Sequence, residues 1–68
     1  MVYLDLKAIR LAMARNQLTV KNVAERAGMT CAGLYRIFAR GSCRCATAGK
    51  LAVALGVPVI EIVTEEMT

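Results

Sequence analysis

Hydrophobic residues recur at helical spacing along most of this chain, and polar residues or glycines separate the segments. The first stripe consists of Leu6, Ile9 and Met13, which are spaced as on one face of a helix. Asp5 is a residue type favoured at helix starts, and Asn16 follows the last apolar position. The pattern therefore predicts a helix between Asp5 and Asn16.

Two further helices are predicted on either side of Gly28. Thr19 is placed to cap the first of them, and Thr30 to cap the second, which extends to Phe38. Gly28 is expected to end the first, because glycine tolerates the positive φ that follows many helices. Their apolar faces consist of Val20, Val23, Ala24 and Ala27 before the glycine, and Leu34, Ile37 and Phe38 after it.

The second half of the chain predicts two more helices. A loop is expected over Ala39–Arg44, and a fourth helix from about Cys45–Thr47 to Leu55. Val57 and Pro58 then begin a short fifth helix, because proline suits a first helical turn.

The predicted fold class is all-α, a compact five-helix domain covering residues 1–68. Residues 2–4 and 62–64 are β-prone, so we expect them to pair as a short ribbon that ties down both termini. The chain has 68 residues and is 57% hydrophobic, which suits one small folded domain. No apolar run approaches the roughly 18–20 residues of a membrane-spanning helix, and the first residues do not resemble a signal peptide. An intracellular, soluble protein is therefore expected.

Charge is distributed unevenly along the chain. Residues 1–56 contain nine Lys and Arg but only two acidic residues, Asp5 and Glu25. Residues 57–68 contain three Glu and no basic residue. This asymmetry favours a polyanionic partner such as nucleic acid, and a solvated surface remains the alternative. The chain has no His, and no phosphate-binding loop or nucleophile with a nearby base is apparent, so an enzyme is not expected.

Residues 20–39 meet the demands of a helix–turn–helix, in which two short helices cross through a tight turn. Ala24 is small where the second helix must cross the first, and Gly28 can adopt the left-handed conformation of the turn. Met29 can fill the space beneath the turn. Leu34 and Ile37 then supply the buried face of the second helix.

In these features the chain resembles the XRE family of helix–turn–helix DNA-binding proteins, of the Cro and phage-repressor type. The resemblance extends over about residues 6–63 and implies a lambda-repressor-like fold. The motifs that carry it are Leu6-Lys7-Ala8-Ile9-Arg10, Val23-Ala24-Glu25-Arg26-Ala27-Gly28-Met29-Thr30, Leu34-Tyr35-Arg36-Ile37-Phe38, Thr47-Ala48-Gly49-Lys50-Leu51-Ala52 and Ala54-Leu55-Gly56-Val57.

The resemblance implies that the third helix, residues 31–38, enters the major groove of double-stranded DNA. Arg36 is the strongest candidate for a specific contact, because a guanidinium can pair with O6 and N7 of guanine. A phosphate contact or a surface ion pair is the alternative for Arg36, and Tyr35 could instead lie against the domain's own surface. The base-contact candidates are Cys31, Ala32, Gly33, Tyr35 and Arg36.

Phosphate contacts are expected from residues that flank this helix, and they would make binding depend steeply on salt. The candidates are Thr19, Lys21, Asn22, Thr30, Arg40, Ser42, Arg44 and Lys50.

Two positions depart from the family pattern. Many members carry Gln where this chain has Val20, and that Gln holds a phosphate. Many also carry Glu where this chain has Phe38, paired with the arginine that corresponds to Arg10. Phe38 is therefore expected in the core, and Arg10 lacks that partner.

The function implied is a sequence-specific transcriptional regulator, a repressor that binds a palindromic operator as a homodimer with half-sites about 10–10.5 bp apart. A bacterial or phage-encoded cytoplasmic protein without a cofactor is expected. The alternative is an antitoxin, or another protein-interaction module of the same fold, with a toxin as protein partner. The predicted dimer interface consists of Val59, Ile60, Ile62, Val63 and Met67.

Cys31, Cys43 and Cys45 leave one further hypothesis open. Three thiolates could bind a soft metal or metalloid, which would make the protein a thiol-responsive or metal-responsive repressor. The alternative is three small apolar residues with no such role, and no metal site is assigned to the chain.

Overall fold

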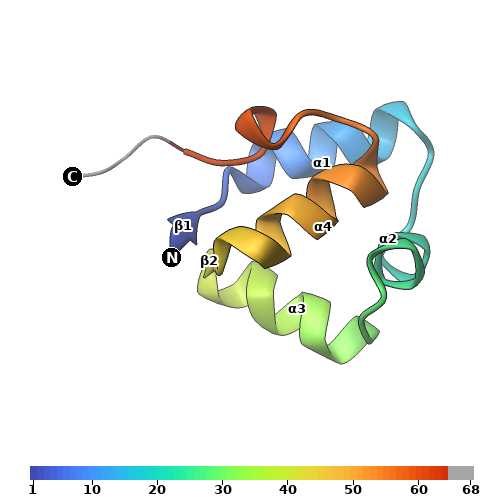
Figure 1. The fold of residues 1–68 in the computed structure, drawn as a ribbon. Coiled ribbons are helices and arrows are strands. Elements are labelled where there is room, and N and C mark those ends of the chain that lie inside the picture. Colours follow the sequence, from blue (N-terminus) through green and yellow to red (C-terminus); the bar gives the residue numbers. More distant parts are fainter. Residues whose placement is uncertain (65–68) are drawn as a thin grey trace.

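The computed structural model describes residues 1–64 and is mostly helical (Figure 1). No helix within these residues is long and apolar enough to cross a membrane. In chain order the elements are β1 (Val2–Tyr3), α1 (Leu6–Arg15), α2 (Val20–Ala27), α3 (Cys31–Arg40), β2 (Ser42–Cys43), α4 (Cys45–Leu55) and the 3-10 turn η1 (Val59–Glu61).

Side-chain caps begin the first three helices, as predicted. The Asp5 carboxylate accepts a hydrogen bond from the Ala8 N–H at 3.1 Å, and the Thr30 hydroxyl accepts one from Gly33 at 3.0 Å. Thr19 and Asn22 form a reciprocal capping box at the start of α2. Each bond satisfies an N–H that the helix itself leaves without a partner.

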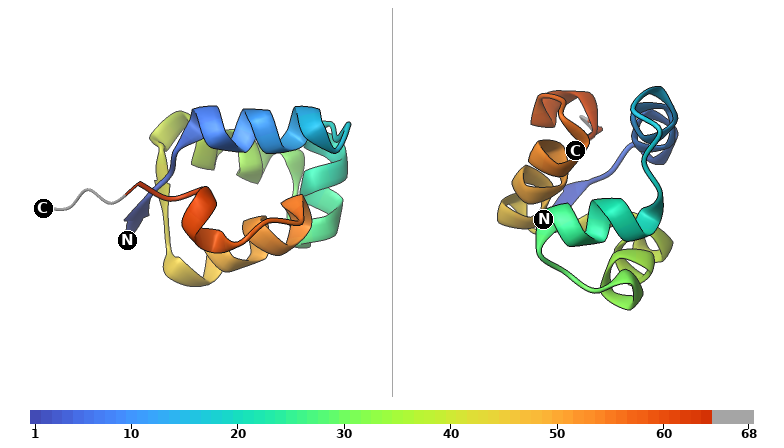
Figure 2. Two further views of the ribbon diagram at one scale, coloured as in Figure 1. Left: turned by 90° about the horizontal axis from the view of Figure 1, so that it is seen from above. Right: turned by 90° about the vertical axis from the view of Figure 1, so that its right-hand side faces the viewer.

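The core lies where α4 packs against the other helices; in Figure 1 α4 is seen between α1 and α3, and in Figure 2 it forms one side of the molecule. Leu51 and Leu55 of α4 are fully buried, and they belong to the same core cluster as Ile9 of α1 and Leu34 of α3. The buried apolar residues among those described are Leu4, Ile9, Ala12, Val23, Ala24, Ala27, Leu34, Cys43, Ala48, Leu51, Ala52, Ala54, Leu55 and Ile62.

One amide side chain and one guanidinium side chain hold the ends of α1 and α2 against the end of α4. The Asn16 amide donates to the Ala12 and Leu55 carbonyls, both at 3.1 Å. Arg26 donates to the Ala54 carbonyl at 3.3 Å. The ends of α1 and α2 are thereby held at the end of α4, where backbone carbonyls have no helical partner.

The terminal ribbon differs from the prediction. Val2 and Tyr3 of β1 pair in antiparallel register with Cys43 and Ser42 of β2 instead of with residues 62–64. Of the predicted pairing, the isolated bridge between Leu4 and Val63 is present. It is supported by the Asp5 N–H donating to Ile62 O and the Thr64 N–H donating to Tyr3 O.

Two other predicted boundaries are corrected. The expected loop over Ala39–Arg44 is wrong, because α3 continues to Arg40, turns at Gly41 with φ +76°, and leads directly into β2. The expected fifth α-helix is only the three-residue turn η1. Pro58 precedes this turn in an extended conformation, so the prediction that it begins an α-helix is wrong.

Candidate nucleic-acid interface

In the first part of α3, one face of the helix is exposed to solvent and the other face packs against the core. Cys31, Ala32, Tyr35 and Arg36 are exposed, and Tyr35 retains 57% of its accessible surface. Leu34, between them, is fully buried. The predicted base-contact candidates, Gly33 apart, thus share an uncovered surface of one helix, which we call the α3 surface.

Gly33 is partly buried on the inner side of the α3 surface. A Cβ added there would lie 3.1 Å from the Thr30 hydroxyl oxygen. That oxygen accepts the Gly33 N–H, so a larger residue would crowd the cap that begins α3. Gly33 is therefore placed to preserve the first turn of the helix.

The α2–α3 connection holds α3 in position. Ala24 and Ala27 are buried small residues, which lets the two helices approach closely. Gly28 ends α2 in the left-handed conformation, with φ +73°. The Met29 N–H then donates to the Ala24 carbonyl at 2.9 Å, and the Met29 side chain packs against the core beneath the turn. In Figure 1 α2 is seen nearly end-on while α3 runs across the view, so the helices cross.

The start of α2 carries several hydrogen-bond donors. Lys21 is exposed beside the capping box of Thr19 and Asn22, which are exposed as well. In that box the Thr19 hydroxyl oxygen and the Asn22 amide oxygen act as acceptors. The hydroxyl proton and the amide NH₂ group therefore remain able to donate to an anion. Thr30 is exposed and keeps its hydroxyl proton in the same way.

The basic residues that follow the α3 surface are exposed at three sites. Arg40 ends α3, Arg44 precedes α4, and Lys50 lies on α4 beside the end of α2, in a shallow groove that Arg26 also lines. Ser42 is the exception, because β2 pairs with β1 and buries this residue to 7% exposure. This corrects the prediction for Ser42, whose hydroxyl does not lie on the surface.

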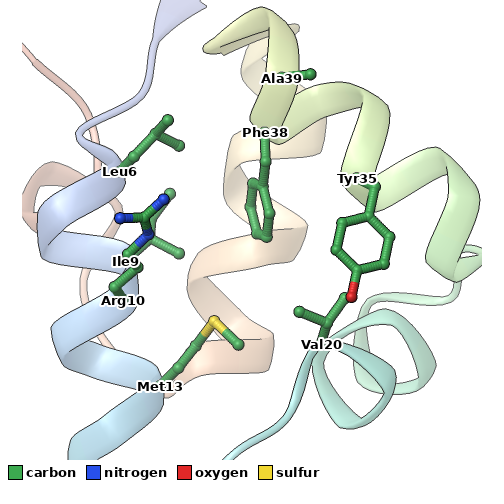
Figure 3. A pocket seen from close by; sticks show the side chains of 8 residues that line it. All are labelled: Leu6, Ile9, Arg10, Met13, Val20, Tyr35, Phe38 and Ala39. Carbon is green, nitrogen blue, oxygen red and sulfur yellow. The ribbon is translucent and has the colours of Figure 1, made fainter.

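A cavity of about 420 Å³ opens between α1 and α3 (Figure 3). It is lined by Leu6, Ile9, Arg10, Met13, Val20, Tyr35, Phe38 and Ala39. Phe38 packs against the core as predicted, but it is only partly buried. The sequence analysis singled out Val20, Phe38 and Arg10 of this lining, but it did not predict the open space between them.

The three cysteines do not form one cluster. Within residues 1–64, no group of three Cys, Asp or Glu side chains is placed to hold a metal ion. Cys31 and Cys45 are exposed, whereas Cys43 is buried in β2. Burial raises the pKa of the Cys43 thiol, and the neighbouring Cys45 raises it further.

The predicted dimer residues are divided between surface and core. Val59 and Ile60 of η1 are 44% and 75% exposed, and Val63 is partly buried. Ile62 has no exposed surface, so this prediction is corrected and Ile62 is a core residue. Met67 lies outside the described residues.

Comparisons with protein-family models, with curated proteins and with solved structures gave no match to this chain.

Proposed function

We propose that this protein is a transcriptional regulator of repressor type that binds double-stranded DNA sequence-specifically, with α3 in the major groove. The observation that carries the proposal is the α3 surface, where Cys31, Ala32, Tyr35 and Arg36 are uncovered around the fully buried Leu34. An α-helix fits the major groove, and helix–turn–helix proteins read bases with the start of their second helix.

The chemistry of the α3 surface suits base reading. Arg36 offers the paired N–H donors that match O6 and N7 of guanine, a contact worth about 1–3 kcal/mol of discrimination. Ala32 and Cys31 offer small apolar groups suited to a thymine methyl. Tyr35 stands on the same side of the helix and can extend the contact along the groove.

Phosphate binding is assigned to the donors around this surface. The start of α2 supplies Thr19, Lys21 and Asn22, and its N–H groups and helix dipole favour an anion. Thr30, Arg40, Arg44 and Lys50 complete the set. The order of helices and the left-handed turn at Gly28 are those expected of the lambda-repressor-like class, and that assignment is part of the proposal.

A homodimer is the second part of the proposal. A single small module makes few base contacts, and two half-sites multiply them. Val59 and Ile60 offer exposed apolar side chains for a second copy. η1 and α3 lie at opposite sides of the molecule in Figures 1 and 2, so a contact through η1 leaves the α3 surface uncovered.

The experiment that tests the proposal is selection of binding sites from random DNA duplexes, carried out for the wild type, Arg36→Ala and Arg15→Ala. Arg15 is the matched control, because its guanidinium lies 3.9 Å from Glu61 of η1, away from α3. Arg36→Ala is expected to lose preference at one base pair, by about 1–3 kcal/mol, while Arg15→Ala retains it.

Two results would count against this function. Selection that enriches no sequence for the wild type would remove specific DNA binding altogether. Uniform weakening by Arg36→Ala, with the base preferences intact, would make Arg36 a phosphate contact instead of a base reader.

A further inference from the structure

The cavity between α1 and α3 combines an apolar lining with one cation. Leu6, Ile9, Met13, Val20 and Phe38 supply most of its wall, and Arg10 is the single charged residue among those lining it. Figure 3 shows the rings of Tyr35 and Phe38 entering from α3, opposite the side chains of α1. At about 420 Å³ the cavity falls within the range of about 300–1,000 Å³ typical of small-molecule sites.

Arg10 is exposed and has no carboxylate partner among the described residues, so its guanidinium is accessible to an anion. Within residues 1–64 no carboxylate lies within 4 Å of its guanidinium, and the ion pair that is present joins Arg15 to Glu61. Phe38 lines the cavity from α3, and its ring forms part of the apolar wall. The arrangement has an anion-binding group at the edge of a space suited to hydrocarbon.

We propose that this cavity binds a small organic anion that has an apolar or aromatic body and one carboxylate. The body would occupy the space beside Phe38 and Met13, where it is removed from water. The carboxylate would pair with the Arg10 guanidinium and accept two parallel hydrogen bonds from it. An inorganic anion would leave the apolar wall empty, and a neutral apolar molecule would leave Arg10 unpaired.

The ligand would touch α3 as well as α1, because Tyr35, Phe38 and Ala39 line the cavity from that helix. The site shares Tyr35 with the α3 surface, but the proposal rests on the cavity and on Arg10 and not on DNA binding. It is therefore tested without DNA, and a failure of either proposal leaves the other standing.

The test is a titration of the full chain with 4-phenylbutyrate, followed by backbone amide NMR and by calorimetry. Two other probes are titrated in the same way: 4-phenylbutan-1-ol, which replaces the carboxylate with a hydroxyl, and inorganic phosphate, which lacks the apolar body. The carboxylate is expected to bind at least about tenfold more tightly than the alcohol, because a charge-assisted pair is stronger than a neutral one. It is also expected to bind at least about tenfold more tightly than phosphate, because phosphate has no apolar body to bury against the wall. Shifts should concentrate on residues 6–13 and 35–39.

The variants are Arg10→Gln and, as matched control, Lys7→Gln. Lys7 is an exposed basic residue of the same helix that does not line the cavity. Arg10→Gln is expected to raise the Kd for 4-phenylbutyrate about tenfold or more, to that of the alcohol, while Lys7→Gln leaves it unchanged.

Equal binding of the alcohol and the carboxylate by the wild type would overturn the proposal, as would absence of binding or shifts reproduced by inorganic phosphate. The wild-type comparison of the three probes does not require any variant to fold, so it decides the matter even if Arg10→Gln is unstable.

Discussion

Cys43 and Cys45 are two residues apart but have different surroundings. Cys43 pairs with Val2 in the small sheet and keeps only 4% of its surface exposed, whereas Cys45 begins α4 in solvent. Burial disfavours the thiolate of Cys43, and a thiolate at Cys45 would repel it, so the pKa of Cys43 lies above its ordinary value of 9.0. Cys43 is therefore a neutral, packed thiol in the folded protein.

Stability should consequently fall in alkaline solution through Cys43. Below about pH 9 the thiol is protonated in both the folded and the unfolded chain and makes no pH-dependent difference. As the pH rises from 9 through the higher folded pKa, the unfolded chain ionises first, and the free energy of unfolding decreases. Urea denaturation at pH 8 and at pH 10 should show a smaller decrease for Cys43→Ala than for the wild type.

Cys31→Ala is the control for this measurement, because Cys31 is exposed at the start of α3. Equal losses in all three proteins would show that Cys43 does not stay protonated on folding. Iodoacetamide labelling followed by mass spectrometry gives a second check, since Cys31 and Cys45 should react before Cys43.

At the scale of elements, local sequence patterns predicted where the helices begin but did not predict how the strands pair. Asp5, Thr19 and Thr30 were predicted as caps because their side-chain oxygens reach an N–H only three residues away, and the structure confirms them. The partner of β1 depends on where α3 ends, about 40 residues further along, and Ser42-Cys43 has no strong strand pattern of its own. Spacing along the sequence does not contain that information.

The turn between α2 and α3 depends on backbone conformation and not on available space. Nothing lies within 4 Å of a Cβ added to Gly28, yet its φ is +73°, which costs other L-residues about 1–2 kcal/mol. Gly28→Ala should therefore destabilise the fold by about 1 kcal/mol, measured by thermal or urea denaturation.

Gly49→Ala is the matched comparison for that substitution. Gly49 also has open space around an added Cβ, but it lies inside α4 without a positive φ. Alanine there should stabilise the protein by about 0.5–1 kcal/mol, because glycine is the poorer helix former. Effects of the same sign at both glycines would contradict this account of the turn.

At the scale of the whole molecule, the C-terminal apolar residues show that spacing along the sequence does not decide which of them lie in the core and which at the surface. The sequence has more apolar residues here than so small a core needs, and it therefore predicts one interface that contains Val59, Ile60, Ile62 and Val63. The turn η1 has 3-10 geometry; Ile60 within it is exposed, whereas Ile62, just after it, is fully buried in the core. The cavity beside Phe38 was missed for a similar reason, since its volume depends on how far apart α1 and α3 are held.

Ile60 and Ile62 form a matched pair for separating association from folding. Ile62→Ala should lower the free energy of unfolding by about 2–5 kcal/mol, because it leaves a hole in the core. Ile60→Ala should change it by less than about 0.5 kcal/mol but weaken the proposed homodimer in sedimentation equilibrium. An Ile60→Ala protein that associates as tightly as the wild type would place the interface elsewhere.

The bridge between Leu4 and Val63 also sets how the molecule responds to mechanical force. Because the bridge is antiparallel, both ends of the described chain leave it in the same direction. A force applied at Thr64 and directed away from Tyr3 would break the Thr64–Tyr3 hydrogen bond first and the Ile62–Asp5 bond second. The residue displaced next would be Ile62, which is fully buried, so the core would open once these two bonds had broken.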